Sequence, residues 1–280
     1  MPATMSPLRY PGGKTQLYPY VKELLLYNNM QKYTYVEPFA GGAGLALKLL
    51  FNGDVPKIII NDFDPAIYAM WYCCLNLPDE LISLVKCAEL SIKEWDTQKG
   101  IYDSPSTHSI LELGFSTLYL NRTNISGIVN GGVLGGRGQT GSCKMDVRFN
   151  KETLTKKIKR IFKHRNQILL YGCDASQFID NIKSQPCLFF NIDPPYVEKG
   201  ARLYRNHYEY AEHQYLSESI IRCHHPWIVT YDVCDLVKTL YGDYRYSKLE
   251  VRYSANIKRN ANEYIFFSNN LNLPSTISLC

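Results

Sequence analysis

The sequence predicts an α/β fold in which a mostly helical segment is inserted between the two halves of a largely parallel sheet. Short apolar runs rich in β-branched and aromatic residues alternate with helical stretches, which is typical of parallel sheets. Four of these runs end on an acid, namely Asp62, Asp174, Asp193 and Asp232. Between about residues 65 and 164 the pattern changes to helical periodicity. We therefore expect a sheet domain from residues 1–64 and 165–280, with an inserted domain from residues 65–164.

The first half of the predicted sheet contains a glycine-rich turn. Residues 33–36 predict a strand, residues 45–51 a helix, and residues 57–60 a strand that ends at Asn61 and Asp62. In nucleotide-binding folds such a turn lets the ligand approach the backbone, and an acid about 20 residues later binds ribose hydroxyls. Gly41 and Asp62 are 21 residues apart, but Gly-Gly-Ala-Gly is not Gly-x-Gly-x-x-Gly, so a dinucleotide is not favoured. A phosphate loop ending at Lys14 is excluded, because Leu8 occupies the place of its first glycine.

The inserted segment combines helices with a basic block. Helical periodicity is clearest over residues 67–75 and 81–90, and six glycines in residues 131–141 predict a flexible loop or a hairpin. From Arg137 to Arg165 the chain has ten Lys and Arg against two acids, a charge of +8 on a chain whose total is +5. Such a block indicates a polyanion partner. The alternative is a solvated helix face over residues 151–165.

In the second half of the predicted sheet, one strand is followed by two prolines. The pattern predicts strands over residues 167–171, 187–192 and 227–231. It also predicts a closing antiparallel pair over residues 244–253 and 263–268. Asp193-Pro194-Pro195-Tyr196 stops the 187–192 run at its carboxyl end, where open α/β sheets bind ligands. A carboxylate beside an exposed aromatic ring suits a flat base with an amino group. The same four residues also fit a plain turn.

Bulk properties favour a cytoplasmic protein without a metal. No apolar run approaches the roughly 18 residues that span a bilayer, and residues 1–14 contain no signal-peptide core. The nine cysteines include no Cys-x-x-Cys pair, and Cys223-His224-His225 lacks metal-ligand spacing. We expect free thiols and no membrane partner.

Taken together, the motifs resemble the Dam-type, alpha-group DNA N6-adenine methyltransferases. The matching stretches are residues 7–14 (Pro-Leu-Arg-Tyr-Pro-Gly-Gly-Lys), residues 37–42 (Glu-Pro-Phe-Ala-Gly-Gly), Asn61-Asp62 and the Asp-Pro-Pro-Tyr motif, in the order of the family. The resemblance covers nearly the whole chain. It implies a Rossmann-like sheet for S-adenosyl-L-methionine, with S-adenosyl-L-homocysteine as product, and an inserted target-recognition domain. The implied activity is site-specific methylation of adenine N6 in double-stranded DNA.

The resemblance also implies roles for individual residues. Asp193 and the Pro194 carbonyl would accept hydrogen bonds from the target amine, and Tyr196 would stack on the base after it leaves the duplex. In-line transfer from a sulfonium then needs positioning and no metal. The implied catalytic residues are Asp193, Pro194, Pro195 and Tyr196. The implied cofactor-binding residues are Tyr10, Lys14, Glu37, Phe39, Ala40, Gly41, Asp62, Asp174 and Asp193.

The inserted domain would read the DNA. The implied DNA-binding residues are Asn121, Arg122, Asn124, Arg137, Gln139, Lys156, Arg160 and Arg259, and loop capping is the alternative role for the first three. The residues around the glycine loop differ from those of GATC-specific members, so the recognised site is not inherited. Expected partners are DNA and a cognate restriction endonuclease, at the nucleoid of a prokaryotic or phage-type host cell. Alternatives are cytosine N4 methylation, adenine methylation in RNA, and an inactive nucleic-acid-binding relative.

Overall fold

The computed structural model describes residues 4–9, 14–197, 208–253 and 259–280, and the chain divides into two compact units. The sheet unit comprises Lys14–Phe63 and Gln167–Cys280. The helical unit comprises Met1–Gly13 and Asp64–Asn166. The division near residues 64 and 165 follows the sequence pattern. The first thirteen residues, which we expected with the sheet, group instead with the helical unit, because buried polar side chains of that unit bind the backbone of residues 6–9.

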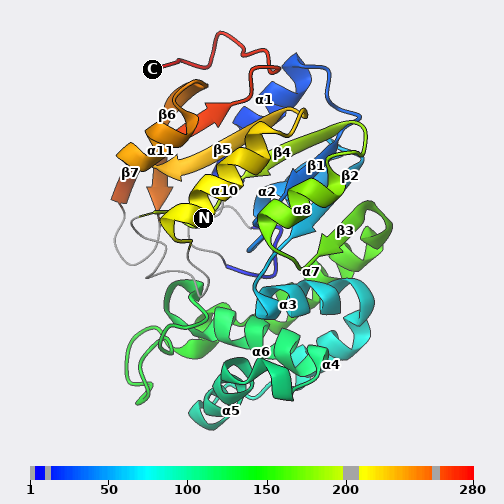
Figure 1. Ribbon diagram of the computed structural model, residues 1–280. Coiled ribbons are helices and arrows are strands. Elements are labelled where there is room, and N and C mark those ends of the chain that lie inside the picture. The colour runs from blue at the N-terminus through cyan, green and yellow to red at the C-terminus, as the bar shows by residue number, and fades with distance from the viewer. Residues whose placement is uncertain (1–3, 10–13, 198–207, 254–258) are drawn as a thin grey trace. The chain divides into compact units, whose positions relative to one another are not determined.

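One seven-stranded sheet forms the centre of the sheet unit (Figure 1). Its strands are β1 (Thr34–Glu37), β2 (Lys57–Asn61), β3 (Ile168–Tyr171), β4 (Leu188–Ile192), β5 (Trp227–Asp232), β6 (Arg245–Tyr253) and β7 (Arg259–Phe267). They lie in the order β3-β2-β1-β4-β5-β7-β6. The first five are parallel, and β7 is antiparallel to both β5 and β6. The predicted α/β fold and the closing antiparallel pair are confirmed.

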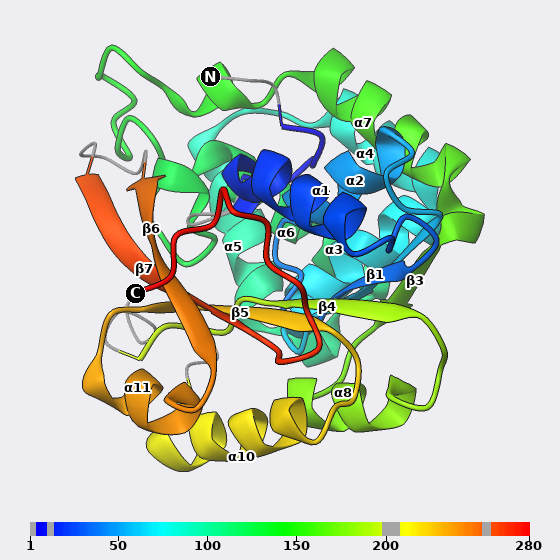
Figure 2. The same cartoon turned by 90° about the horizontal axis from the view of Figure 1, so that it is seen from above.

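Helices cover both faces of this sheet (Figure 2). One face carries α1 (Tyr18–Tyr27), which follows the short turn η1 (Lys14–Leu17), and α2 (Gly44–Phe51). The other carries α8 (Ala175–Ile182), α10 (Tyr210–Ile221) and α11 (Asp235–Tyr241). The local sequence explains where two of these helices begin. Pro19 pre-sets the first turn of α1, and the Asp174 side chain accepts hydrogen bonds from two backbone N–H groups that open α8.

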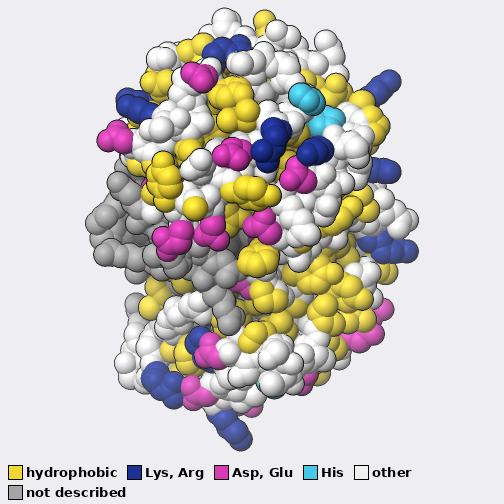
Figure 3. Space-filling view, viewed as in Figure 1, with side chains coloured by type: hydrophobic (Ala, Val, Ile, Leu, Met, Phe, Trp, Pro, Cys, Tyr) yellow, Lys and Arg dark blue, Asp and Glu magenta, His cyan; other side chains and the backbone are white. Residues whose placement is uncertain are grey.

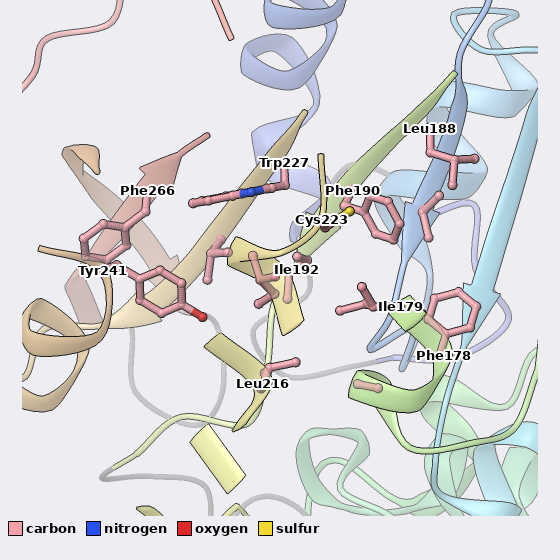
Figure 4. Close-up of a cluster of buried hydrophobic side chains, with 14 of the residues drawn as sticks. Phe178, Ile179, Leu188, Phe190, Ile192, Leu216, Cys223, Trp227, Tyr241 and Phe266 are labelled. Carbon is pink, nitrogen blue, oxygen red and sulfur yellow. The ribbon is translucent and has the colours of Figure 1, made fainter. Parts of the chain in front are cut away.

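The larger apolar core of the sheet unit lies under α8, α10 and α11 (Figure 4). Alternate residues of the central strands point into it, because successive side chains of a strand face opposite sides of the sheet. From β4 these are Leu188, Phe190 and Ile192, and they meet Phe178 of α8 and Leu216 of α10. The residues between them in β4 therefore point to the face of α1 and α2, and that face carries the polar groups described below.

The described part of the helical unit contains five helices and, from the third helix onward, several single helical turns between or after them. The helices are α3 (Pro65–Asn76), α4 (Pro78–Cys87), α5 (Ile92–Asp103), α6 (Ile110–Thr123) and α7 (Lys151–Lys163), and the turns are η2 (Pro105–Thr107), η3 (Ile125–Gly127), η4 (Met145–Arg148) and η5 (Arg165–Gln167). Every residue of α6 from Leu113 onward is buried, and α6 packs against α3, α4 and α5. Asp64, Ser109 and Asn150 cap α3, α6 and α7. None of the described helices is long and apolar enough to cross a membrane.

The glycine-rich segment at residues 131–141 is an irregular loop, and the hairpin that we considered does not form there. Its single β pairing is an isolated bridge between Asn124 and Val133. The Gln139 side chain closes the loop, donating to the Leu134 and Gly136 carbonyls and accepting from the Met145 backbone N–H. Gly135 and Gly136 have φ values of 86° and 70°, which favour glycine and break any strand geometry.

Candidate active site

The strand order reverses between β1 and β4, which marks the expected ligand site of the sheet unit. The chain proceeds outward from β1 to β2 and β3, then returns to place β4 on the other side of β1. In open α/β sheets, ligands bind at the carboxyl ends of the strands that flank such a switch point. Here those ends carry Glu37, the last residue of β1, and Asp193, the first residue after β4.

Strand alternation brings further polar side chains to the same face. Val36, Ile192, Tyr231 and Tyr264 point into the core under α8, α10 and α11. Their chain neighbours therefore point to the opposite face. These neighbours are Glu37, Asn191, Asp193, Thr230, Asp232 and Glu263, and Asp232 and Glu263 are direct partners across β5 and β7. The sheet thus gathers four carboxylates on one side of its carboxyl edge.

Asp193 is held by one carboxylate oxygen. Its Oδ1 lies 2.9 Å from the Nζ of Lys14 and accepts a hydrogen bond of 2.8 Å from the Thr230 hydroxyl. Its Oδ2 makes no hydrogen bond to a described residue, and the side chain is 24% exposed. Residues 193–196 carry no assigned secondary structure, and a turn is assigned at Val197. The anchored carboxylate presents a second oxygen that can accept a donor from a ligand.

Tyr196 is buried, although we expected an exposed ring. Its side chain is 6% exposed, and its hydroxyl donates to Oε1 of Glu263 at 2.5 Å. Lys14 donates to the same hydroxyl at 2.7 Å and forms an ion pair of 3.4 Å with Oε2 of Glu263. The Asp193–Tyr196 segment is therefore held at both ends by Lys14. Asp232 also holds it, because its carboxylate accepts a hydrogen bond of 3.3 Å from the backbone N–H of Val197.

Glu37 is buried among polar groups at the end of β1. Its Oε1 accepts hydrogen bonds from the Tyr35 hydroxyl at 3.1 Å and the Ala46 backbone N–H at 3.2 Å. Burial raises the pKa of Glu37 to about 8, and nearby Asp193 contributes in the same direction. Next to it, the Oδ1 of Asn191 is buried and has no hydrogen-bond partner among the described residues. A buried carboxyl beside an unsatisfied carbonyl oxygen fits the ammonium group of an amino-acid ligand.

The glycine-rich turn brings the first helix close to the end of β2. Gly41 has a φ of 44°, and its backbone N–H donates to Oδ2 of Asp62 at 2.7 Å. Gly44 opens α2 so close to Thr15 that an added Cβ would lie 2.4 Å from the Thr15 hydroxyl. The Ala40 N–H donates to the Asn61 carbonyl at 2.8 Å. The predicted turn and the predicted acid are thus in contact.

Asp174 has a structural role that explains its position after β3. Its Oδ1 caps α8, and its Oδ2 accepts a hydrogen bond of 3.1 Å from the Tyr208 hydroxyl. The Tyr208 ring meets the edge of Phe39 with centroids 5.8 Å apart. Phe39 is half-buried, and the rings of Phe39 and Tyr208 lie between the glycine-rich turn and Asp174.

Three predicted DNA-binding residues are buried in the helical unit and bind its own backbone. Asn121 accepts from the Arg9 N–H and donates to the Arg9 and Gly127 carbonyls, which leaves it no donor for a base. Arg122 donates to the Pro7 carbonyl at 2.6 Å, and Asn124 accepts from the Trp95 indole and donates to three loop carbonyls. Loop capping, the alternative role, therefore describes all three in this structure.

The remaining predicted DNA-binding residues are more varied. Arg137 forms an exposed bidentate ion pair with Asp96, Gln139 closes the glycine-rich loop, and Lys156 pairs with Glu152 one helical turn away. Arg160 is an exposed residue of α7, and Arg259 begins β7. Tyr10, predicted to bind the cofactor, lies outside the described residues. The face drawn in Figure 3 mixes basic, acidic and apolar side chains and carries no uniform basic patch.

A cluster of cations lies inside the helical unit. Burial lowers the pKa of Arg122 to about 10 and that of Lys157 to about 8, and neighbouring Arg9 contributes to both shifts. Arg148 also lowers the pKa of Arg122, and its own Nη1 is buried without a hydrogen-bond partner among the described residues. Mutual repulsion of this kind would be relieved by an anion.

Sequence reasoning missed several residues of the site, above all Thr230, Asn191 and Glu263. Thr230 and Asn191 lie inside apolar strands, where Thr and Asn are not unusual. Glu263 offered a signal, because a charged residue directly before Tyr264-Ile265-Phe266-Phe267 is a polar group in a strand that the sequence marks as buried.

Residues 10–255 match the profile of the family described as D12 class N6 adenine-specific DNA methyltransferase. No curated protein matches the chain. A candidate RNA methyltransferase from Pyrococcus horikoshii aligns with a TM-score of 0.44 at 8% identity, over 93% of this chain and 85% of that one. A candidate class I S-adenosylmethionine-dependent methyltransferase from Listeria monocytogenes aligns with a TM-score of 0.39 at 11% identity, over 94% of this chain and 62% of that one.

Proposed function

Because the chain belongs to the D12 class N6 adenine-specific DNA methyltransferase family, we propose that its sheet unit methylates an adenine extruded from double-stranded DNA, with Asp193 as the acceptor of the target amine. One observation carries this proposal. Oδ1 of Asp193 is anchored by Lys14 and Thr230, while Oδ2 is left for a ligand. An acceptor held in this way needs no reorganisation when the amine arrives.

The amine needs such an acceptor because its lone pair is conjugated with the base and is a poor nucleophile. A hydrogen bond from the amine to Oδ2 of Asp193, and a second to the Pro194 carbonyl, would favour a nitrogen whose lone pair points out of the ring plane. That lone pair would form the new bond to the methyl carbon while the bond from that carbon to sulfur breaks and its electron pair stays on sulfur, which leaves S-adenosyl-L-homocysteine. The proton that the nitrogen then releases would leave to solvent. The protein supplies alignment and electrostatics.

S-Adenosyl-L-methionine supplies a methyl group already activated on a sulfonium. The pocket of Glu37 and Asn191 would hold its amino-acid portion, since it offers a carboxyl and an unsatisfied carbonyl oxygen. Asp62, in contact with the turn at Gly41, would bind the ribose hydroxyls, and Phe39 and Asp174 would lie at the adenine ring. Ala40 and Gly41 would approach the cofactor through their backbones.

Extrusion of the base is part of the proposal, because enzymes that act on a base inside a duplex must first remove it from the stack. Tyr196 is the proposed stacking residue. Its ring would have to become more exposed in the complex, since its side chain is 6% exposed here. The hydroxyl contacts with Lys14 and Glu263 would keep the ring near the Asp193 carboxylate.

We assign DNA binding to the helical unit, on the strength of α7. Its exposed cations include Lys156, Lys159 and Arg160, which suit contacts to phosphates and carry no sequence information. Arg137 would have to leave Asp96 to reach DNA, at little cost because both side chains are exposed. A genomic DNA substrate places the protein in the cytoplasm at the nucleoid. A restriction endonuclease that recognises the same DNA sequence would be its partner, and methylation would protect the host DNA from that endonuclease.

The deciding experiment follows transfer of tritium from labelled cofactor to duplex DNA, with separation of the product nucleosides. We expect label in N6-methyladenine. Label in N4-methylcytosine, or in RNA but not DNA, would contradict the proposal. Sequencing DNA from an expressing host for modified bases then gives the recognised site.

The role of Asp193 is tested with two variants. Asp193→Ala removes the acceptor and Asp193→Asn keeps one oxygen but adds a donor. We expect the transfer rate to fall by about 10²- to 10⁴-fold in both, with cofactor affinity retained, because the acceptor acts on the amine. Unchanged turnover in Asp193→Ala would remove this residue from the mechanism.

A further inference from the structure

Glu263 is a carboxylate in the middle of the sheet unit for which no role has been assigned. It belongs to β7, its side chain is 1% exposed, and it faces Asp232 across the antiparallel pair. A buried carboxylate with a like-charged neighbour is costly unless a cation or hydrogen bonds compensate it. Burial accordingly raises the pKa of Glu263, and the charge of Lys14 opposes that shift.

The compensation comes from two residues that also contact the Asp193–Tyr196 segment. Glu263 accepts from the Tyr196 hydroxyl through Oε1 and pairs with Lys14 through Oε2 at 3.4 Å. An ammonium group has three N–H donors. Those of Lys14 meet Asp193 Oδ1, the Tyr196 hydroxyl and Glu263 Oε2. Glu263 is thus a contact of Lys14 that lies outside the Asp193–Tyr196 segment.

This arrangement matters because lysine is long and flexible. Its four-carbon chain allows the ammonium group many positions, and a lysine held only by Asp193 could follow that carboxylate as it moves. Glu263 is fixed in the sheet by its strand partners on both sides. An anchor in the sheet makes Lys14 a fixed point against which Asp193 is oriented.

We propose that Glu263 is a positioning residue for methyl transfer, which fixes Lys14 and the Tyr196 hydroxyl and through them the direction of the free oxygen of Asp193. The inference rests on the proposed function of Asp193 as acceptor. Glu263 itself does not touch the substrate. Its effect is expected on the rate of the chemical step, because a misplacement of about 1 Å can cost about 10²-fold in rate.

The test is single-turnover methyl transfer by Glu263→Gln at saturating cofactor and DNA. The substitution keeps the size of the side chain and one acceptor oxygen and removes the charge that holds Lys14. We expect the rate constant to fall by about 10- to 100-fold while the dissociation constant for S-adenosylmethionine changes by less than about threefold. A matched control is Asp54→Asn, which removes the partner of Lys22 (2.8 Å) elsewhere in the sheet unit and is expected to leave the rate unchanged.

A double-mutant cycle with Lys14→Gln separates positioning from a general loss of structure. If Glu263 acts through Lys14, adding Glu263→Gln to Lys14→Gln should lower the rate by less than about threefold. Losses that multiply in the double variant would overturn the inference. So would a Glu263→Gln enzyme with a wild-type rate.

The pH profile gives a third measurement that a purely structural role would not move. Glu263 has to be ionised to hold Lys14, so the wild-type rate should decline on the acid side as Glu263 gains a proton. That decline should be absent from Glu263→Gln, and an identical acid limb in both proteins would contradict the inference. If Asp193→Ala turns over at the wild-type rate, the proposed role of Asp193 as acceptor fails. If Asp193→Ala is inactive and Glu263→Gln is not, only the positioning role fails.

Discussion

At the scale of single residues, Glu37 has the most informative chemistry after Asp193. Its carboxyl is 6% exposed and hydrogen-bonded within the pocket, and its pKa is raised to about 8 by burial. The cofactor-free protein therefore holds a proton on Glu37 at pH 7. An ammonium group bound beside it would favour the ionised carboxylate and expel that proton.

We therefore predict that cofactor binding at pH 7 releases close to one proton. Calorimetric titrations in two buffers of different ionisation enthalpy measure the number directly. Glu37→Gln should bind more weakly and release none. Equal binding heats in the two buffers for the wild-type protein would contradict this assignment.

The same residue predicts a pH dependence of stability without cofactor. A carboxyl whose pKa is raised in the folded state stabilises the fold below its ordinary value near 4.5, and this contribution is lost as the pH rises through about 8. The free energy of unfolding should fall over that window by up to about 1.4 kcal/mol per pH unit from this group. Urea denaturation across the window should show a shallower decline in Glu37→Gln than in the wild-type protein.

Thr230 allows a direct test of the anchored oxygen of Asp193, because a single hydroxyl group of Thr230 donates to it. Thr230→Val keeps the shape and removes the donor to Asp193, and Thr230→Ser keeps the donor. A hydrogen bond to a charged group contributes about 1.5–3 kcal/mol, so we expect Thr230→Val to slow transfer by about 10- to 100-fold. Thr230→Ser should remain within about threefold of wild type in the same single-turnover assay. Equal rates for the two variants would show that the hydroxyl is not needed.

At the scale of elements, the N-terminal segment of the helical unit depends on α6. Asn121 makes three hydrogen bonds to the backbones of Arg9 and Gly127, and an added Cβ at Gly127 would lie 2.6 Å from the Arg9 carbonyl. Gly127 has a φ of 79°, so it meets both a conformational and a steric requirement. The segment is thus fitted to one surface of its own unit.

Asn121→Leu should destabilise the protein by about 2–4 kcal/mol, because it leaves several buried backbone groups without partners. Trypsin should also cut after Arg9 faster than in the wild-type protein. The control is Asn76→Ala, an exposed amide at the end of α3, which should change stability by less than about 0.5 kcal/mol. Denaturant midpoints and timed proteolysis measure both effects.

Strands β1, β2, β4 and β5 were predictable from sequence because each is a short run rich in apolar residues that ends at or directly before Asn, Asp or Pro. The Asp193–Tyr196 motif and Glu37 could likewise be found, since each directly follows or ends a strand. The sequence does mark Glu263 as a charged residue in an apolar strand, but the roles of Glu263 and Thr230 could not be predicted, because they depend on the register of β5 against β7 and on alternation within the folded sheet. The grouping of residues 4–9 was missed for a similar reason. Asn121 is far from Arg9 in sequence, and no local pattern links them.

At the scale of the whole molecule, the charge is concentrated in one stretch. Residues 137–165 carry ten basic side chains against two acids, whereas the total charge is +5. DNA binding should therefore weaken steeply with salt, as phosphate contacts release counterions. Affinity that comes from phosphates should depend little on the sequence of the DNA.

Lys156→Gln and Lys159→Gln should each lower the slope of log affinity against log salt concentration by about one, equally for specific and unrelated DNA. Lys57→Gln, at the start of β2 and so at the amino ends of the parallel strands, should leave the slope unchanged. Fluorescence anisotropy across a salt series measures all three. A slope unaffected by both α7 variants would remove this helix from the DNA interface.

The hydrogen bonds that hold residues 4–9 on the helical unit also limit how segments can be exchanged between such enzymes. The insertion resembles an exchangeable segment, because it begins just after β2 and ends just before β3. These two strands are adjacent and parallel in the sheet. A graft of residues 64–166 alone would carry Asn121, Arg122 and Lys157 without the carbonyls that they bind. If the helical unit binds the DNA as proposed, exchange of DNA specificity between relatives requires two pieces of chain, the insertion and residues 4–9, to be inherited together.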